Sequence, residues 1–133
     1  MIDNMYLTFF LGDEEYALPV ENIVEVSTLT TVRPIPMTSQ YYKGIIKLRG
    51  NLVSIIDTRL LLNMEKNDTS DSSIICKIDD LWFGYLVDDI GEMITIDQNT
   101  ITQQTIEGDT DRIKGIARIG KRVIIVLNIN NLK

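Results

Sequence analysis

The sequence predicts an all-β fold of two small five-stranded β-barrels packed side by side, with only short helical turns. The first observation behind this prediction is an internal repeat of about half the chain. It comprises three pairs of corresponding segments: 16–26 with 83–93, 43–48 with 114–119, and 52–57 with 123–128. The second observation is that short runs rich in Val, Ile, Thr, Tyr and Phe alternate with Gly, Asp and Asn, which is typical of strands and turns. Two copies are too few for a solenoid, so we expect two similar β units.

Ten strands are expected, five in each copy of the repeat. Their residue ranges are 6–11, 15–18, 24–32, 45–48, 52–57, 74–78, 81–87, 93–96, 113–119 and 123–127. Gly and Asp residues predict the hairpin turns between them. These turns are expected at 12–14, 50–51, 79–80 and 120–121.

The segments between the strands predict turns and little helix. Asp57 and Asn128 each precede a short apolar run, and we expect both to cap a short helix. Residues 33–36 contain two prolines and must be extended, whereas 38–42 suits a single turn. The polar run 67–73 is the best linker, which divides the chain into halves of roughly 1–70 and 71–133.

Length and composition indicate one soluble domain made of two subdomains. Each half of the 133 residues is too short for a comfortable core of its own, so the halves are expected to share an interface. No apolar run is long enough for a membrane helix. The single cysteine, Cys76, lies in an apolar run, where we expect it to be buried, and a reducing cytoplasm is the expected location. A net charge of −6 argues against nucleic-acid binding, which needs a basic stripe.

The residues offer little chemistry. There is no histidine, and a lone thiol without an imidazole partner is a poor nucleophile. No glycine-rich phosphate loop occurs. Asp79-Asp80 and Asp88-Asp89 are adjacent carboxylates, but strand neighbours point to opposite faces and turn carboxylates face water. We therefore predict no catalytic residue, no cofactor and no metal, and we expect the chain to bind proteins through its strand edges and surfaces.

One long segment resembles the signature of a known family. Residues 41–59, YYKGIIKLRGNLVSIIDTR, are similar to the CheW pattern K/L-G-V-x-N-L-R-G-x-V-V-P-V-x-D-L-R. Residues 12–25 resemble the opening hairpin of that family, and 83–88 resemble its later F-G-x-V-V-D segment. Lys47, Ser54 and Thr58 depart from the usual Asn, Pro and Leu without changing the hydrophobic alternation.

The resemblance implies a free-standing, non-enzymatic chemotaxis coupling protein. Its fold would be two SH3-like five-stranded barrels between which the chain crosses, so the midpoint of the sequence need not be the spatial boundary. Its partners would be the regulatory domain of the histidine kinase CheA and the cytoplasmic tips of methyl-accepting chemoreceptors. Recruitment to receptor arrays without membrane insertion would follow. The alternative class is a generic SH3-like or OB-like module that binds nucleic acid or a small ligand.

The resemblance also implies which residues meet the partners. They are Arg49, Gly50, Gly44, Ile23, Val24 and Glu25. Composition alone would make Arg49 an ordinary surface arginine, but the family signature includes it. Gly44 also suits a purely structural role, a close backbone approach within a strand. Strand alternation buries one of Ile23 and Val24.

Overall fold

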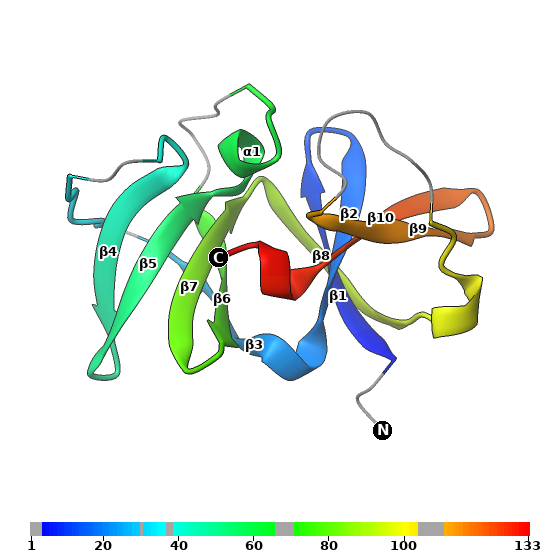
Figure 1. Cartoon of the computed structure of the whole chain (residues 1–133), viewed down its shortest axis with the longest axis horizontal. Helices are drawn as coiled ribbons and strands as arrows, with labels where there is room; N and C mark the ends of the chain where they lie inside the picture. Colours follow the sequence, from blue (N-terminus) through cyan, green and yellow to red (C-terminus); the bar gives the residue numbers. More distant parts are fainter. Residues whose placement is uncertain (1–3, 30, 37–38, 66–70, 104–110) are drawn as a thin grey trace. The chain divides into compact units, whose positions relative to one another are not determined.

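The computed structural model describes residues 4–29, 31–36, 39–65, 71–103 and 111–133 (Figure 1). Ten strands dominate it, which confirms the all-β class. The strands are β1 (Met5–Leu11), β2 (Glu14–Pro19), β3 (Ile23–Thr28), β4 (Tyr42–Leu48), β5 (Asn51–Asp57), β6 (Ser72–Ile78), β7 (Leu81–Val87), β8 (Asp89–Thr95), β9 (Ile113–Ile119) and β10 (Arg122–Leu127). The described helical segments are α1 (Thr58–Leu61) and the 3-10 turns η1 (Val20–Asn22), η2 (Gln98–Thr100) and η3 (Ile129–Asn131).

The strands form two five-stranded sheets with the same plan. Their orders are β8-β1-β2-β10-β9 and β3-β6-β7-β5-β4. In each sheet two antiparallel hairpins meet through one parallel pair, β2 with β10 or β7 with β5. The fifth strand of each sheet lies at an edge, where β8 pairs with β1 and β3 pairs with β6. The sheets lie in two compact units: unit 1 contains Met1–Asn22 and Asp89–Lys133, and unit 2 contains Ile23–Asp88.

The two units do not coincide with the sequence halves 1–70 and 71–133. Each unit takes the first hairpin of one repeat copy and the last three strands of the other copy. The physical reason is the length of two connections. If β3 followed β2 into the same sheet and took the edge position next to β1, it would run parallel to β2. A connection between parallel strands of one sheet needs a dozen or more residues. Only Val20–Asn22 separate β2 from β3, and only Asp88 separates β7 from β8, so the chain enters the other sheet instead.

Each sheet is closed by one additional backbone bridge. Arg33 pairs with Ile45 in unit 2, and Thr102 pairs with Ile116 in unit 1. Both amides of each pair donate to the partner's carbonyl oxygen at 2.9 Å. Ile45 and Ile116 are 71 residues apart, so the bridges occupy corresponding places in the repeat. The closed sheets are the two small barrels that the sequence predicts.

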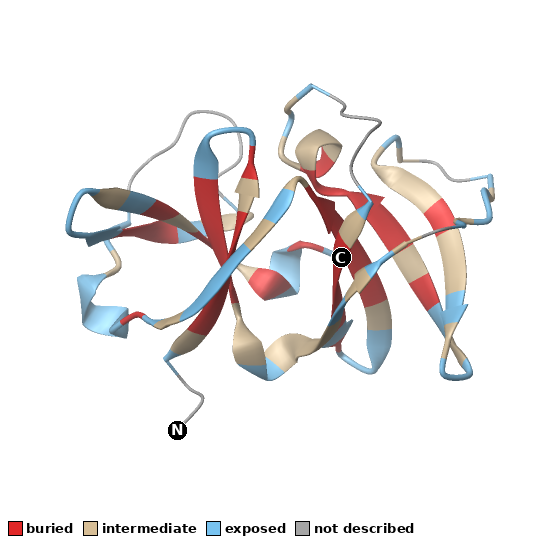
Figure 2. Cartoon of the chain, turned by 180° about the vertical axis from the view of Figure 1, so that it is seen from behind, coloured by how far each residue is buried: buried red, intermediate tan, exposed pale blue. Residues whose placement is uncertain are grey.

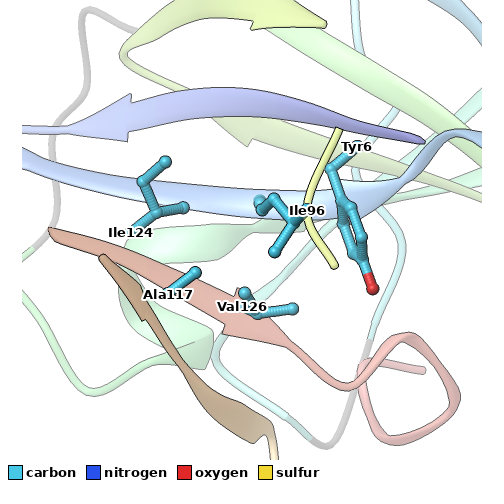
Figure 3. Packing of buried hydrophobic residues seen from close by; sticks show 6 residues of the cluster. Tyr6, Ile96, Ala117, Ile124 and Val126 are labelled. Carbon is cyan, nitrogen blue, oxygen red and sulfur yellow. The ribbon is translucent and has the colours of Figure 1, made fainter. Parts of the chain in front are cut away.

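The barrel cores come from corresponding strand positions. Figure 2 shows the buried residues along the strands and the exposed residues at the hairpin ends. In unit 2 the core cluster contains Val53, Ile55, Ile75 and Leu86. In unit 1 it contains Tyr6, Ala17, Ile96, Ala117, Ile124 and Val126, whose side chains gather between the strands in Figure 3. Val53 with Ile124 and Ile55 with Val126 are repeat equivalents, so the repeated apolar pattern builds both cores.

Several local predictions differ from the structure. The turn expected at 50–51 is Arg49–Gly50, because β5 begins at Asn51. β8 begins four residues earlier than expected, at Asp89, since a bulge interrupts its alternation. The β3 strand ends at Thr28 rather than at residue 32, and of residues 33–36 only Arg33 takes part in β pairing, as an isolated bridge to Ile45. Residue 38 of the predicted turn and residues 67–70 of the predicted linker lie outside the described residues.

The two predicted helix caps have different outcomes. Asp57 Oδ1 accepts a hydrogen bond from the Leu60 amide at 3.2 Å, which confirms it as the cap of α1. Asn128 precedes η3 but makes no side-chain capping bond. Instead, its backbone amide donates to the Arg112 carbonyl oxygen at 2.8 Å. The cap prediction for Asn128 is therefore wrong, because its backbone amide and the Asn131 side chain, which donates to the Asp111 carbonyl oxygen at 2.7 Å, anchor this turn instead.

Candidate interaction surface

An ion pair joins the two edge strands of unit 2. Glu25 lies on β3, and Arg49 directly follows β4. Arg49 Nη2 lies 3.0 Å from Glu25 Oε1. The Arg49 side chain is 67% exposed, whereas that of Glu25 is 25% exposed. The structure therefore brings two of the predicted partner-binding residues together, and the guanidinium stays open to a partner.

The hairpin turn at Arg49 requires a backbone conformation that arginine rarely adopts. Arg49 has φ 52° and Gly50 has φ 81°. Two successive positive φ angles define a type I′ turn, in which Asn or Gly is preferred at the first position. An arginine there costs about 1 kcal/mol or more in backbone energy. Asn51 Nδ2 donates to the Arg49 carbonyl oxygen at 3.3 Å and supports the turn. A long cation at a position that folding alone would give to Asn indicates a surface role for Arg49.

Two exposed apolar side chains flank the ion pair in sequence. Val26 follows Glu25 and is 45% exposed, while Leu52 follows the turn and is 66% exposed. Exposed Val and Leu beside a charged pair are typical of protein-binding surfaces. Neither residue is among the predicted partner-binding residues. The exposure of Leu52 could have been predicted from strand alternation, because its neighbours Val53 and Ile55 belong to the core and Leu52 must therefore point outward.

A β-bulge sets the direction of Glu25. Ile23 pairs with Cys76 and Glu25 pairs with Ile75, so Val24 is the extra residue on β3. Val24 packs against the unit 2 core, and Ile23 is half-buried. Bulges re-aim side chains at sheet edges. Val24 is therefore the core-facing member of the pair, and the bulge turns Glu25 toward Arg49.

Gly44 has a structural reason for being glycine. It is buried, and a Cβ atom on it would lie 2.2 Å from the Arg33 carbonyl oxygen and 3.0 Å from Pro34 Cα. Its φ of 150° is also rare for residues with side chains. Gly44 thus lets residues 33–34 close the barrel. The structure places it in this seam rather than with Arg49, Gly50 and Glu25 on the surface.

A second ion pair holds the end of unit 2 together. Arg59, on α1, donates from Nε to both carboxylate oxygens of Asp88 at 3.1 and 3.2 Å, and its Nη2 also contacts Asp88. The two side chains are 19% and 13% exposed. Asp88 is the last residue before the chain enters unit 1. This pair was not predictable from the sequence, because no spacing rule connects residues 29 positions apart.

The described residues show no arrangement suited to catalysis. Burial raises the pKa of the Cys76 thiol to about 12, so it stays protonated at neutral pH. Within the described ranges no three His, Cys, Asp or Glu side chains are grouped to hold a metal ion. No helix among the described residues is long and apolar enough to span a membrane. What the chain presents is surface, with the Arg49 and Glu25 pair as its most distinctive feature in unit 2.

Comparison with known proteins gives consistent matches over nearly the whole chain. A CheW-like domain model matches residues 5–133. The chemotaxis protein CheW of Helicobacter pylori is 29% identical over 131 residues, covering 96% of this chain and 79% of that protein. The Treponema pallidum CheW is 28% identical, covering 95% of this chain and 79% of that protein.

Comparison with solved structures shows that a CheW protein has the same fold as this chain. The crystal structure of the scaffolding protein TtCheW from Thermoanaerobacter tengcongensis matches with a TM-score of 0.87 and 29% identity. That match covers 99% of this chain and 88% of the other. The similarity extends over both units and is not restricted to one motif. From the domain match, the relatives and the shared fold, we conclude that this chain belongs to the CheW-like domain family.

Proposed function

We propose that this chain is a non-enzymatic chemotaxis adaptor that couples the cytoplasmic tips of methyl-accepting receptors to the regulatory domain of the histidine kinase CheA. The CheW-like match over residues 5–133 carries the proposal. The curated relatives are chemotaxis proteins, and the solved relative is a scaffolding protein. A scaffold needs surfaces rather than reacting groups. In this role the chain would work in the cytoplasm, at membrane-associated receptor arrays.

The Arg49 surface is the proposed contact with one of these partners. It comprises Arg49, Gly50 and Glu25, together with Ile23 and Val24, which position Glu25. A guanidinium presents its donors in a planar fork that suits carboxylates and carbonyl oxygens. The ion pair with Glu25 holds that fork in place before a partner arrives, which lowers the entropic cost of binding.

The alternative, a barrel that binds nucleic acid or a small ligand, has less support. The chain carries a net charge of −6, and phosphate backbones attract proteins through basic surfaces. Steeply salt-dependent nanomolar binding to DNA or RNA would favour this alternative over the adaptor function.

Binding measurements on the full chain test the adaptor function and its site together. The wild type is titrated with a CheA regulatory domain and, separately, with a receptor cytoplasmic fragment. Arg49→Ala should stay folded and lose affinity for one partner by about tenfold or more, equivalent to about 1.4 kcal/mol. Lys121→Ala removes an exposed cation from the corresponding hairpin of unit 1 and serves as the control.

The outcomes separate the site from the function. If the wild type binds both partners but Arg49→Ala binds them equally well, the site is wrong and the adaptor function stands. If the folded wild type binds neither partner, the adaptor function itself is wrong. A thermal melt of each preparation shows whether a loss of affinity reflects unfolding.

A further inference from the structure

The glutamate and arginine arrangement of unit 2 has a counterpart in unit 1. Glu92 on β8 is the repeat equivalent of Glu25, and it too lies at a bulge in its edge strand. Arg122, from the β9–β10 hairpin, donates from Nη1 to Glu92 Oε1 at 2.8 Å. Arg122 is not the repeat equivalent of Arg49, which is Gly120, but lies two residues after it. Both units therefore place such a pair at the corresponding end of the sheet.

Arg122 is held more firmly than Arg49. Its Nε donates to Glu15 Oε1 at 3.1 Å, and its Nη2 donates to Glu15 Oε2 at 2.6 Å. These hydrogen bonds raise the pKa of the Arg122 guanidinium and lower that of the Glu15 carboxyl. With three of its donors engaged by two carboxylates, Arg122 is a fixed part of the surface. It is poorly placed to receive a further acidic group.

A shallow groove surrounds this arginine. One pocket, of about 480 Å³, has Phe10, Val123 and Ile125 as its apolar lining residues. An adjoining pocket, of about 530 Å³, shares Phe10 and Arg122 and extends to Thr8 and Gly91. The carboxylates along the two pockets are Asp13, Glu14, Glu15 and Glu92. The lining thus holds four carboxylates against one guanidinium.

The exposed apolar positions correspond as well. Val123 is 46% exposed and is the repeat equivalent of Leu52, while Met93, next to Glu92, is equivalent to Val26. In both units an exposed apolar side chain directly follows the glutamate, and a second one follows the hairpin turn, next to Arg122 in unit 1 and three positions after Arg49 in unit 2. The units differ in charge at two positions, because the groove of unit 1 has Glu14 and Glu15 where the repeat equivalents in unit 2 are Leu81 and Trp82. The acidic turn residue is shared, since Asp80 is the repeat equivalent of Asp13.

We propose that this groove of unit 1 is a docking surface for a basic amphipathic segment of a partner protein. An aliphatic side chain of that segment would rest on Phe10 and Val123, and flanking Lys or Arg residues would face Asp13, Glu14 and Glu92. Charge complementarity identifies this occupant, since an acidic segment would meet like charge. A second copy of the chain, with its net charge of −6, is a poorer match. The proposal is independent of the coupling function and of the Arg49 surface.

The test uses the full chain and a defined probe. The probe is a fluorescent amphipathic helical peptide of Leu, Ala and Lys, with a counterpart in which every Lys is replaced by Glu. Val123→Lys and Asp13→Lys each change an exposed groove residue. Leu52→Lys makes the same change at the equivalent exposed position of unit 2, so it matches Val123→Lys in net charge. Fluorescence anisotropy measures affinity, and amide shifts in NMR spectra locate the contact.

The expected result is that the Lys peptide binds the wild type and shifts amides in 10–15 and 120–125. Val123→Lys and Asp13→Lys should each weaken this binding about tenfold, whereas Leu52→Lys should leave it within about twofold. The Glu peptide should not bind. Equal weakening by Val123→Lys and Leu52→Lys, which change the net charge by the same amount, would reduce the effect to net charge and overturn the proposal. A wild-type dimer that Val123→Lys dissociates in sedimentation would overturn it in favour of a second copy.

Discussion

Arg49 occupies a turn position that suits asparagine better than arginine. Its positive φ costs about 1 kcal/mol for a residue other than Gly or Asn. Its ion pair with Glu25 returns at most about that amount, because the arginine side chain is largely exposed. The two contributions nearly cancel. Stability alone therefore gives no reason to keep an arginine at this position.

We expect Arg49→Asn to change the free energy of unfolding by no more than about 0.5 kcal/mol. The relief of backbone strain should offset the lost ion pair. Urea denaturation of both proteins measures the difference. A loss of several kcal/mol would contradict this expectation and would show that the pair with Glu25 holds the barrel closed. In that case any loss of partner binding by an Arg49 variant would be indirect.

Glu15 links stability to pH in unit 1. Hydrogen bonds from Arg122 lower the pKa of this carboxyl below its ordinary value of 4.5. At acid pH the unfolded chain therefore takes up this proton before the folded chain does, so stability falls as pH falls. The contribution of Glu15 is complete above about pH 4.5 and is lost as the pH falls through the folded-state pKa.

Glu15→Gln should lower the free energy of unfolding by about 1 to 2 kcal/mol at neutral pH. The difference from the wild type should shrink as the pH falls well below 4.5, because both side chains are then uncharged. Denaturant titrations across this range provide the test. A difference that stays constant with pH would mean that Glu15 acts through packing rather than through charge.

At the scale of elements, barrel closure depends on glycine. Gly44→Ala should destabilise the protein by about 2 kcal/mol or more, because the new methyl group would overlap the Arg33 carbonyl. Gly120→Ala is the control, since its φ of 60° is also positive but its Cβ position is open. The control should lose only about 1 kcal/mol. Thermal melts compare the two variants, and equal losses would show that backbone conformation, not the seam, decides the effect.

The strands were largely predictable, because their physics is local. Alternating β-branched residues and Gly or Asp turns located all ten strands to within a few residues. The bulges at Val24 and Gly91 were not predictable, since they depend on pairing partners distant in sequence. For the same reason the family signature implied Arg49 and Glu25 separately but not the ion pair between them. The Arg122 cluster went unnoticed, because Glu15 is 107 positions away from it.

At the scale of the whole molecule, the repeat did not predict the exchange of hairpins between its copies, and only the family resemblance implied that the chain crosses between the barrels. Both copies carry the same apolar pattern, so that pattern fits either pairing equally well. Connection length was the available signal. Three residues after β2 and one after β7 cannot form a parallel crossover within a sheet.

This topology predicts how the separated halves behave. Residues 1–70 contain β1–β5, and 71–133 contain β6–β10, so neither half holds all the strands of one unit. We expect each half alone to form no closed monomeric barrel. An equimolar mixture should recover the circular dichroism spectrum of the intact chain. A half that is monomeric and unfolds cooperatively by itself would contradict the connection-length argument.

The same arrangement sets an order of events at the ribosome. Unit 2 is one continuous stretch and has all its strands once Asp88 has emerged. The β1–β2 hairpin is made first, yet it must wait for β8, β9 and β10, which are complete only at Leu127. During that interval it exposes unpaired strand edges, which are the usual starting points of aggregation. The β1–β2 hairpin is thus synthesised before its partner strands but is among the last segments to pair, and holdase chaperones would find their target in residues 5–19 of the nascent chain.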